Sequence, residues 1–260
     1  MMLRACMALL AAVVTLAPGT ADARRCSAVS GPDRVPLIEL YTSEGCDSCP
    51  PADRWLATTA AEAFKAGRAV PLALHVDYWD HLGWRDPYAS AQFSARQRAS
   101  AQRANSRVIY TPQVQVNGRD FRGWGDRRAV ARALDAGGGP ARAKLALEAT
   151  QQGAAPWTIA VNAEAAGETA RGAGVYLALY ESGLVSQVKA GENRGATLRH
   201  DFVVREWLGP LPLDATGRLS DTRTLPARVD IDYSRAGIAA FVQDARGEIL
   251  QTLALPLCGG

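Results

Sequence analysis

Val35-Pro36-Leu37-Ile38-Glu39-Leu40-Tyr41 is followed, after a four-residue loop, by Cys46-Asp47-Ser48-Cys49-Pro50-Pro51. The first stretch has the apolar character and length of a buried strand, and the residues from Pro51 onward begin like a helix. Two thiols three residues apart at a strand-to-helix junction can close a disulfide or share a metal ion. The chemistry of the chain therefore depends on what this cysteine pair does.

The same strand and helix begin an alternating series of elements. The expected strands are 37–41, 69–76 and 113–116, and the expected helices are 51–66, 87–104 and 126–134. Asn117-Gly118 is a strong hairpin-turn dipeptide, so residues 120–124 should return antiparallel to the third strand. A parallel strand pair combined with an antiparallel hairpin predicts an α/β domain over residues 24–136.

The composition changes at Gly137-Gly138-Gly139-Pro140, which we expect to be a linker. After it, short alternating segments are separated by turn residues, without a convincing helix between them. These segments are 144–150, 157–163, 175–182, 198–205, 227–233, 238–244 and 249–255. The pattern predicts an all-β antiparallel sandwich domain over residues 141–260.

The N-terminus has the features of a secretory signal peptide. An apolar stretch over residues 5–16 precedes the small-residue signature Ala21-Asp22-Ala23, which predicts a signal peptide over residues 1–23. The stretch is too short to span a bilayer, and no later segment approaches the roughly 20 apolar residues that a membrane helix needs. The sequence thus predicts an exported protein, periplasmic or secreted, with no membrane span.

Four of the five cysteines follow the predicted cleavage site, and an even number in an oxidising compartment favours disulfides. Cys26 and Cys258 stand near the two ends of the mature chain, and chain termini are often close together. Chain-entropy models give about 5 kcal/mol for a disulfide that closes so long a loop. We expect a structural disulfide, with a bridge between subunits or a second redox pair as the alternatives.

Charge argues against a nucleic-acid binder. The net charge is only +3, and a nucleic-acid binder should concentrate its basic residues on one face. The best candidates are Arg96, Arg103 and Arg107, which share one side at helical spacing, on a helix expected to start with Asp86 as its N-cap. We interpret them as a solvated helix face and predict no nucleic-acid partner.

The position of the cysteine pair predicts a division of roles. Cys46 precedes the predicted helix, whose N-terminal amides favour the thiolate that attacks disulfides. Cys49, one turn later, is close enough to resolve a mixed disulfide. We therefore expect Cys46 to be the nucleophile and Cys49 the resolving thiol. Because Pro50 moves the helix start past the cysteines and Asp47 adds a negative charge, the dithiol should be closer to a reductant than to a strong oxidant.

The order of elements resembles the thioredoxin-like fold, with Cys-x-x-Cys after the first core strand and Thr111-Pro112 before the hairpin. Residues 40–53, 75–80 and 191–195 resemble more specifically a family of secreted bacterial thioredoxin-like proteins with a domain of unknown function. This resemblance covers nearly the whole mature chain. It implies that Thr111 and a cis Pro112 hold the substrate backbone, and that Glu39 is the buried acid that shuttles protons to the resolving cysteine.

The predicted function is thiol–disulfide exchange with a protein or small-molecule disulfide, supported by an electron-transfer partner of unknown identity. No cofactor is expected, because the dithiol itself carries the electrons. Trp79 or Trp84 is expected to line the substrate groove.

Two alternatives stay open. Cys46 and Cys49 could bind copper or zinc in a metal carrier, together with His75 and His81, because soft thiolates and imidazoles suit these ions. The pair could instead be a structural disulfide in a non-catalytic binding module. His200, on an alternating segment, is interpreted as a structural histidine.

Overall fold

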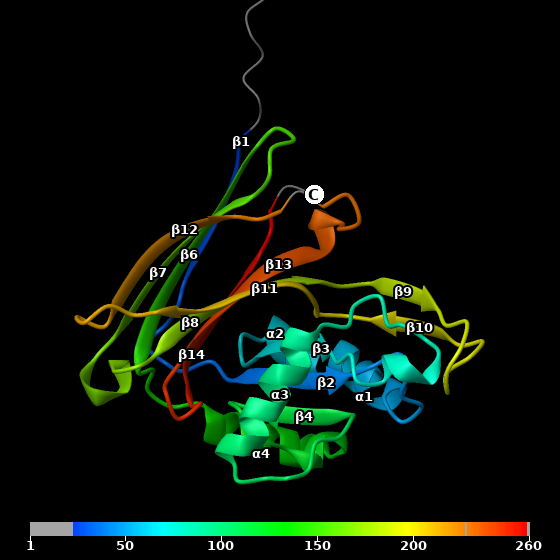
Figure 1. Ribbon diagram of the computed structural model, residues 1–260. Coiled ribbons are helices and arrows are strands. Elements are labelled where there is room, and N and C mark those ends of the chain that lie inside the picture. The colour runs from blue at the N-terminus through cyan, green and yellow to red at the C-terminus, as the bar shows by residue number, and fades with distance from the viewer. Residues whose placement is uncertain (1–22, 227, 259–260) are drawn as a thin grey trace, which may run out of the picture.

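The computed structural model describes residues 23–226 and 228–258, which form mainly β-strands (Figure 1). The largest sheet has eight strands, in the spatial order β14 (Ile249–Pro256), β13 (Ala236–Gln243), β8 (Gly174–Glu181), β11 (Val203–Pro212), β3 (Val70–His75), β2 (Leu37–Thr42), β4 (Gln113–Val116) and β5 (Arg119–Asp120). A second sheet has the order β1 (Ala23–Val29), β6 (Ala143–Gln152), β7 (Thr158–Ala165) and β12 (Arg218–Thr224). A separate hairpin consists of β9 (Leu184–Gln187) and β10 (Thr197–His200).

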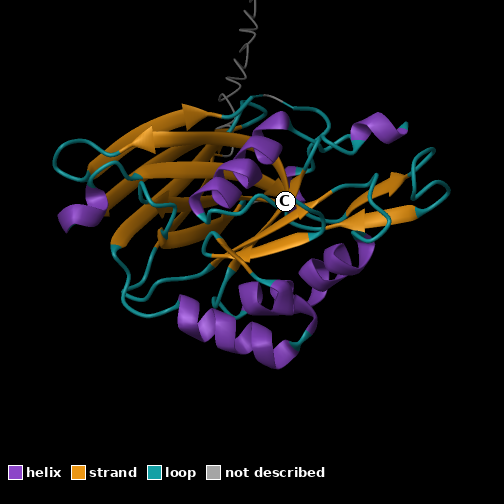
Figure 2. Cartoon of the chain, turned by 60° about the horizontal axis from the view of Figure 1, so that its bottom comes forward, coloured by secondary structure: helices purple, strands orange, loops and turns teal. Residues whose placement is uncertain are grey.

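The helices lie outside the strand layers (Figure 2). One continuous helical run contains α1 (Pro50–Trp55), a π-helical turn (Leu56–Ala60) and α2 (Ala61–Lys65). The other two helices are α3 (Ala91–Arg103) and α4 (Arg127–Gly137). Short 3-10 turns occupy Asp80–Leu82, Arg122–Gly125, Gly167–Ala170 and Tyr233–Arg235. No helix in the described part of the chain has the length and apolar character needed to cross a membrane.

The eight-stranded sheet joins strands from both halves of the chain. β2 pairs with β3 in parallel, and Val203 at the start of β11 pairs in parallel with Ala73 of β3. The prediction of an α/β thioredoxin-like N-terminal domain followed by an all-β antiparallel sandwich domain is therefore wrong. The strands β2 to β5 do not form an α/β domain, because they share one largely antiparallel sheet with β8, β11, β13 and β14.

The physical reason for the error lies in β3. All six residues of β3 are buried, so both of its edges need hydrogen-bonding partners. The partner on its second edge is β11, and the chain between the two is too long for a local hydrophobic pattern to reveal the pairing. The amide of Ala73 donates to the carbonyl oxygen of Phe202 (2.8 Å), which extends the contact.

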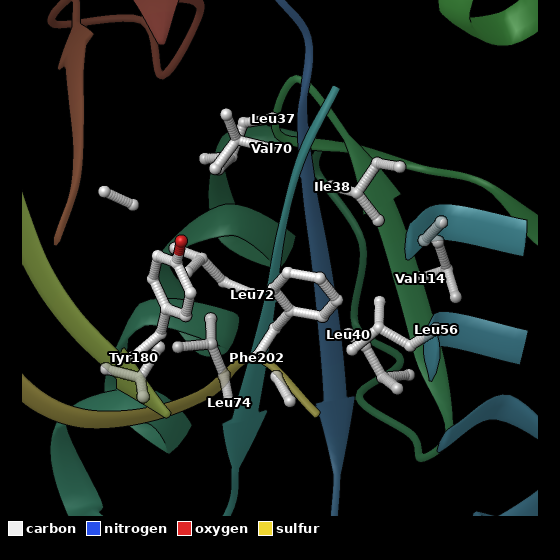
Figure 3. Close-up of a cluster of buried hydrophobic side chains, with 14 of the residues drawn as sticks. Leu37, Ile38, Leu40, Leu56, Val70, Leu72, Leu74, Val114, Tyr180 and Phe202 are labelled. Atoms are coloured by element: carbon white, nitrogen blue, oxygen red, sulfur yellow. The ribbon is translucent and has the colours of Figure 1, made fainter. Parts of the chain in front are cut away.

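β8 contributes to both hydrophobic cores of the molecule. Its residues Val175, Leu177 and Leu179 pack in the core next to the four-stranded sheet. Tyr180 points to the opposite face, where it lies with Phe202 beside side chains of β2 and β3 (Figure 3). One strand of the C-terminal half thus completes the core of the N-terminal half.

Several element boundaries differ from the expected ones. α3 begins at Ala91 with Ser90 as its N-cap, not at Asp86. The segment 198–205 is divided between β10 and β11 by Phe202, whose φ of 56° interrupts the extended backbone. The hairpin after Asn117-Gly118 is confirmed, although its second strand, β5, is only two residues long.

Other expectations fall outside the observed strands or outside the described residues. The described residues of the segment 227–233 form no strand, and β1, β9 and β12 were not expected. Gly137 of the predicted linker is the last residue of α4, and residues 138–140 lie between α4 and β6. The predicted domain boundaries stay a prediction. The predicted signal peptide lies outside the described residues except for Ala23.

The predicted pairing of Cys26 with Cys258 is confirmed. A disulfide joins the two residues, whose Cα atoms are 5.9 Å apart. Cys26 belongs to β1, and Cys258 follows β14. The disulfide therefore links β1, an edge strand of the four-stranded sheet, to the residue that follows β14, an edge strand of the eight-stranded sheet.

Candidate functional site

The second disulfide joins Cys46 and Cys49 in the turn between β2 and α1. Cys49 is the N-cap residue of α1, and its carbonyl oxygen accepts hydrogen bonds from the amides of Ala52 (2.9 Å) and Asp53 (3.1 Å). The amide of Cys49 donates to the carbonyl oxygen of Cys46 (3.2 Å), which closes the turn. As expected from the sequence, the pair stands at the entrance of a helix.

Both cysteines are fully buried, with 0% of their surface exposed, although the two residues between them are exposed. The loop Gly191–Gly195 of the β9–β10 hairpin lies against the backbone of this turn. The side-chain amide of Asn193 donates to the carbonyl oxygens of Glu44 (2.9 Å) and Cys46 (2.8 Å). Glu192 accepts a hydrogen bond from the amide of Asp47 (3.1 Å). The pair is therefore enclosed in this conformation.

Five ionisable side chains form a buried group next to the turn: Glu44, Asp53, His75, Asp86 and His200. We call this group the acid–imidazole cluster. Nδ1 of His75 lies 2.7 Å from a carboxylate oxygen of Asp86, and Nε2 of His200 lies 3.1 Å from one of Glu44. The two imidazole rings meet edge to face, with their centroids 4.9 Å apart. Each histidine thus has one nitrogen against a carboxylate.

The outer contacts of the cluster fix its carboxylates. Glu44 also accepts a hydrogen bond from Nε1 of Trp84 (2.8 Å). Asp86 accepts from the amides of Glu44 (2.8 Å) and Tyr88 (2.9 Å). Hydrogen bonds therefore join the loop that follows β2 to the loop that follows β3, next to the cysteine turn.

Asp53 is the member of the cluster with the fewest partners. It stands one helical turn after Cys49, and one of its carboxylate oxygens is 4.0 Å from Nδ1 of His200. Three buried atoms of the cluster have no hydrogen-bond partner among the described residues: Asp53 Oδ1, His75 Nε2 and His200 Nδ1. Unpaired buried polar atoms are costly. These three atoms are therefore the least satisfied polar atoms of the cluster.

The pKa values in the cluster follow from burial and from these pairs. Burial raises the pKa of Asp53, and the positive charges of His200 and His75 oppose this only in part. Burial alone would lower the pKa of His75 and raise that of Asp86. The attraction between the two groups outweighs burial, so the pKa of His75 is raised and that of Asp86 is lowered. The contact of His75 with Asp86 is therefore that of an ion pair, whereas the pKa of Asp53 is raised.

Glu39 has a different environment from the one its predicted role requires. Its carboxylate is paired with Arg96 of α3 (2.5 Å) and accepts a hydrogen bond from the hydroxyl of Tyr41 (3.2 Å). Arg96 is buried among the rings of Tyr176, Trp207 and Phe241, each 5.0 Å from its guanidinium carbon. The interpretation of Arg96 as part of a solvated helix face is therefore wrong.

Thr111 and Pro112 are connected to the cysteine turn through Trp79. The Thr111–Pro112 peptide bond is cis. Nε1 of Trp79 donates to Oγ1 of Thr111 (2.7 Å). A Cβ atom added at Gly45 would lie 3.1 Å from the Cβ of Trp79, so this tryptophan packs directly on the residue before Cys46. Trp79 thus contacts Thr111 through its indole nitrogen and lies next to Gly45 of the cysteine turn through its Cβ.

The alternative metal ligands are not gathered in one site. His75 is buried, whereas His81 is exposed and contacts the carbonyl oxygen of Tyr78 (2.8 Å). Across residues 23–226 and 228–258, no group of three or more histidine, cysteine, aspartate or glutamate side chains is arranged to hold a metal ion. The copper or zinc carrier stays a prediction without support from this arrangement.

The sequence analysis missed Glu44, Asp53, Asp86 and Asn193 as site residues. A usable signal was present for Glu44 and Asp53, because these acidic residues flank the cysteine pair between apolar segments. Asn193 and His200 come from a hairpin far along the chain. Only the folded structure places them at the turn.

Two solved protein structures are similar to most of this chain. A protein of Agrobacterium tumefaciens with an X-ray crystal structure is 27% identical, covers 87% of this chain and 96% of its own, and superposes with a TM-score of 0.63. HBP35 of Porphyromonas gingivalis has a TM-score of 0.65 over 86% of this chain and 76% of its own, at 14% identity, which shows a similarity of fold alone. No curated protein is significantly similar.

A family model described as "Protein of unknown function (DUF1223)" matches residues 37–243. The matched range contains the Cys46–Cys49 pair, the whole acid–imidazole cluster and the β9–β10 hairpin. The chain belongs to the DUF1223 family of proteins of unknown function.

Proposed function

We propose that the protein is a thiol–disulfide oxidoreductase that acts through Cys46 and Cys49 on a protein or small-molecule disulfide. The observation that carries this proposal is the placement of a short-range disulfide against a buried cluster of ionisable side chains. A disulfide with a sequence separation of 3 constrains the unfolded chain by only about 2 kcal/mol, against about 5 kcal/mol for the separation of 232 between Cys26 and Cys258. Stability alone is thus a weak reason for the Cys46–Cys49 disulfide.

The reaction divides between the two cysteines. In the reduced protein, the Cys46 thiolate attacks one sulfur of the target disulfide, forms a mixed disulfide and releases the other target sulfur as a thiolate. Cys49, as a thiolate, then attacks Cys46 Sγ and releases the second target sulfur. Two electrons pass to the target, and the Cys46–Cys49 disulfide forms. The reverse sequence reduces this disulfide and oxidises a target dithiol.

The acid–imidazole cluster supports this chemistry because each direction moves protons as well as electrons. Cys49 must lose a proton before it attacks the mixed disulfide, and it regains one when the disulfide is reduced. Asp53 stands one helical turn from Cys49 and has a raised pKa. We assign Asp53, rather than the ion-paired Glu39, the role of holding this proton.

The test is the reduction potential of the Cys46–Cys49 pair combined with an insulin-reduction assay. We expect a potential in the range of exchange-active pairs, about −270 to −120 mV, nearer the reducing end because of Asp47. Cys46→Ser and Cys49→Ser should abolish insulin reduction. A variant with both Cys26→Ser and Cys258→Ser is the matched control and should retain it.

A structural disulfide in a non-catalytic binding module is the second candidate. It is favoured by the complete burial of both cysteines. This candidate predicts a potential below about −300 mV, as in structural disulfides, and no activity with insulin. The same two measurements therefore decide between the candidates.

We also propose that the protein works in an oxidising compartment outside the cytoplasm. Two disulfides in one chain are rare in reducing cytosol and common in exported proteins. Cell fractionation with thiol labelling tests this. The protein should be recovered with the exported fraction and with all four of these cysteines protected from alkylation.

A further inference from the structure

We propose that Asn193 is a positioning residue for the Cys46–Cys49 pair, and that the loop Gly191–Gly195 controls the access of thiols to it. This inference rests on the proposed function, because it concerns how a reagent reaches the same disulfide. The hairpin that carries the loop lies beside α1 in the fold (Figure 1).

The Asn193 amide joins two carbonyl groups of the cysteine turn. Its Nδ2 atom donates to the carbonyl oxygens of Glu44 (2.9 Å) and Cys46 (2.8 Å), on either side of Gly45. A primary amide nitrogen has two hydrogens, so both bonds can form together. Asp47, which follows Cys46 in the turn, is held as well, because its amide donates to the carboxylate of Glu192 (3.1 Å). Three hydrogen bonds from two adjacent residues therefore cover one side of the pair.

The loop has internal hydrogen bonds that do not involve the cysteine turn. The amide of Gly195 donates to the carbonyl oxygen of Val188 (2.8 Å), and that of Ala196 donates to the carbonyl oxygen of Asn193 (3.0 Å). Gly191 and Gly195 have φ values of 73° and 86°, in the left-handed region that favours glycine. Opening the loop would break its contacts with the turn and keep these internal bonds.

The base of the hairpin is held separately from its tip. His200 of β10 pairs with Glu44 inside the acid–imidazole cluster. Ser186 of β9 makes a 3.4 Å contact with the hydroxyl of Tyr88. Because both contacts lie in the strands, the tip can open while the hairpin stays attached.

The enclosure of the disulfide makes such opening necessary for exchange. A thiolate must reach one sulfur of a disulfide directly, and both cysteines are 0% exposed. Asn193→Ala removes both hydrogen bonds to the turn. Asn193→Asp would instead bring a carboxylate against two carbonyl oxygens. Both variants should increase the fraction of time in which the disulfide can be reached.

The experiment measures how fast dithiothreitol and glutathione each reduce the Cys46–Cys49 disulfide in the full chain, with alkylation and peptide mass spectrometry to follow each disulfide. Asn193→Ala should accelerate reduction of Cys46–Cys49 about tenfold, the effect expected for the loss of two ordinary hydrogen bonds. Reduction of Cys26–Cys258 should not change. Arg194→Ala is the matched control, because Arg194 is an exposed loop residue with no side-chain hydrogen bond among the described residues.

The outcomes separate this inference from the proposed function. An unchanged rate in a folded Asn193→Ala protein, or equal acceleration at both disulfides, would overturn the access role. If Asn193→Ala does not fold, Glu192→Ala decides, since Glu192 is exposed and its loss should still accelerate reduction two- to fivefold, a range set by one hydrogen bond. Faster reduction in the variants without any insulin activity would uphold the access role and refute the oxidoreductase.

Discussion

At the scale of single residues, the acid–imidazole cluster has three carboxyl groups and only two imidazoles. The three carboxyl groups differ in how many hydrogen bonds they accept. Glu44 and Asp86 each accept several hydrogen bonds, whereas Asp53 has one oxygen with no partner among the described residues. Asp53 is therefore the carboxyl group of the cluster to which we assign the proton, and burial raises its pKa.

This assignment predicts how stability depends on pH. Because the pKa of Asp53 is higher in the folded than in the unfolded protein, its contribution to stability falls as the pH rises from the ordinary value of 3.8 through the raised value. Asp53→Asn removes this loss, so the variant should gain stability relative to the wild type between about pH 4 and pH 7. Urea denaturation at both pH values measures the difference in the free energy of unfolding between variant and wild type, and the exposed Asp47→Asn is the control. A constant difference between variant and wild type would contradict the assignment.

The His75–Asp86 pair should have a large effect on stability. Asp86→Asn leaves a buried imidazolium without its partner and should cost about 3 kcal/mol, measured by urea denaturation near pH 6. Because the pKa of His75 is raised, the stability from the pair is fully present below the ordinary histidine value of 6.5. It is lost as the pH rises through the raised value. The destabilisation caused by Asp86→Asn should therefore shrink at higher pH, and a loss that grows instead would argue against the ion pair.

At the scale of elements, α3 is fixed to the large sheet by the pair of Arg96 and Glu39. Arg96→Met leaves the Glu39 carboxylate buried and unpaired, and should destabilise the protein by about 3 to 5 kcal/mol. The double variant with Glu39→Gln should recover much of that loss. Chemical denaturation of both single variants and the double variant forms a mutant cycle. Additive losses would show that the two residues do not act as a pair.

The elements also show what the sequence could and could not predict. The strand Leu37–Thr42, the helical run from Pro50 and the N-cap at Asp126 follow local patterns, and the structure contains all three. Asp86 has the sequence features of an N-cap, and one of its carboxylate oxygens does accept from the amide of Tyr88, yet α3 begins only at Ala91 and the other oxygen lies against His75 of β3. A local pattern cannot show that a distant side chain contacts the same group. Asn193 and His200 escaped notice as partners of the cysteine turn for the same reason.

At the scale of the whole molecule, the pairing of β3 with β11 decides that the two halves of the chain share one sheet. The composition of both strands is compatible with several partners, so periodicity predicts the strands but not their neighbours. The pairing of Cys26 with Cys258 could be predicted because the two cysteines stand near the ends of the predicted mature chain, and chain termini are often close together. A contact between residues far apart in the sequence could thus be predicted only where two cysteines can form a covalent bond.

The Cys26–Cys258 disulfide should stabilise the whole molecule without taking part in exchange. It spans a sequence separation of 232, and the chain-entropy model assigns such a loop about 5 kcal/mol, of which strain and residual structure in the unfolded chain remove some. The variant with both Cys26→Ser and Cys258→Ser should therefore unfold at clearly lower urea concentration than the wild type. The reduction potential of Cys46–Cys49 should be the same in the two proteins, since the disulfides lie in different parts of the fold. A shifted potential would instead indicate that the two pairs exchange electrons, as expected of a second redox pair.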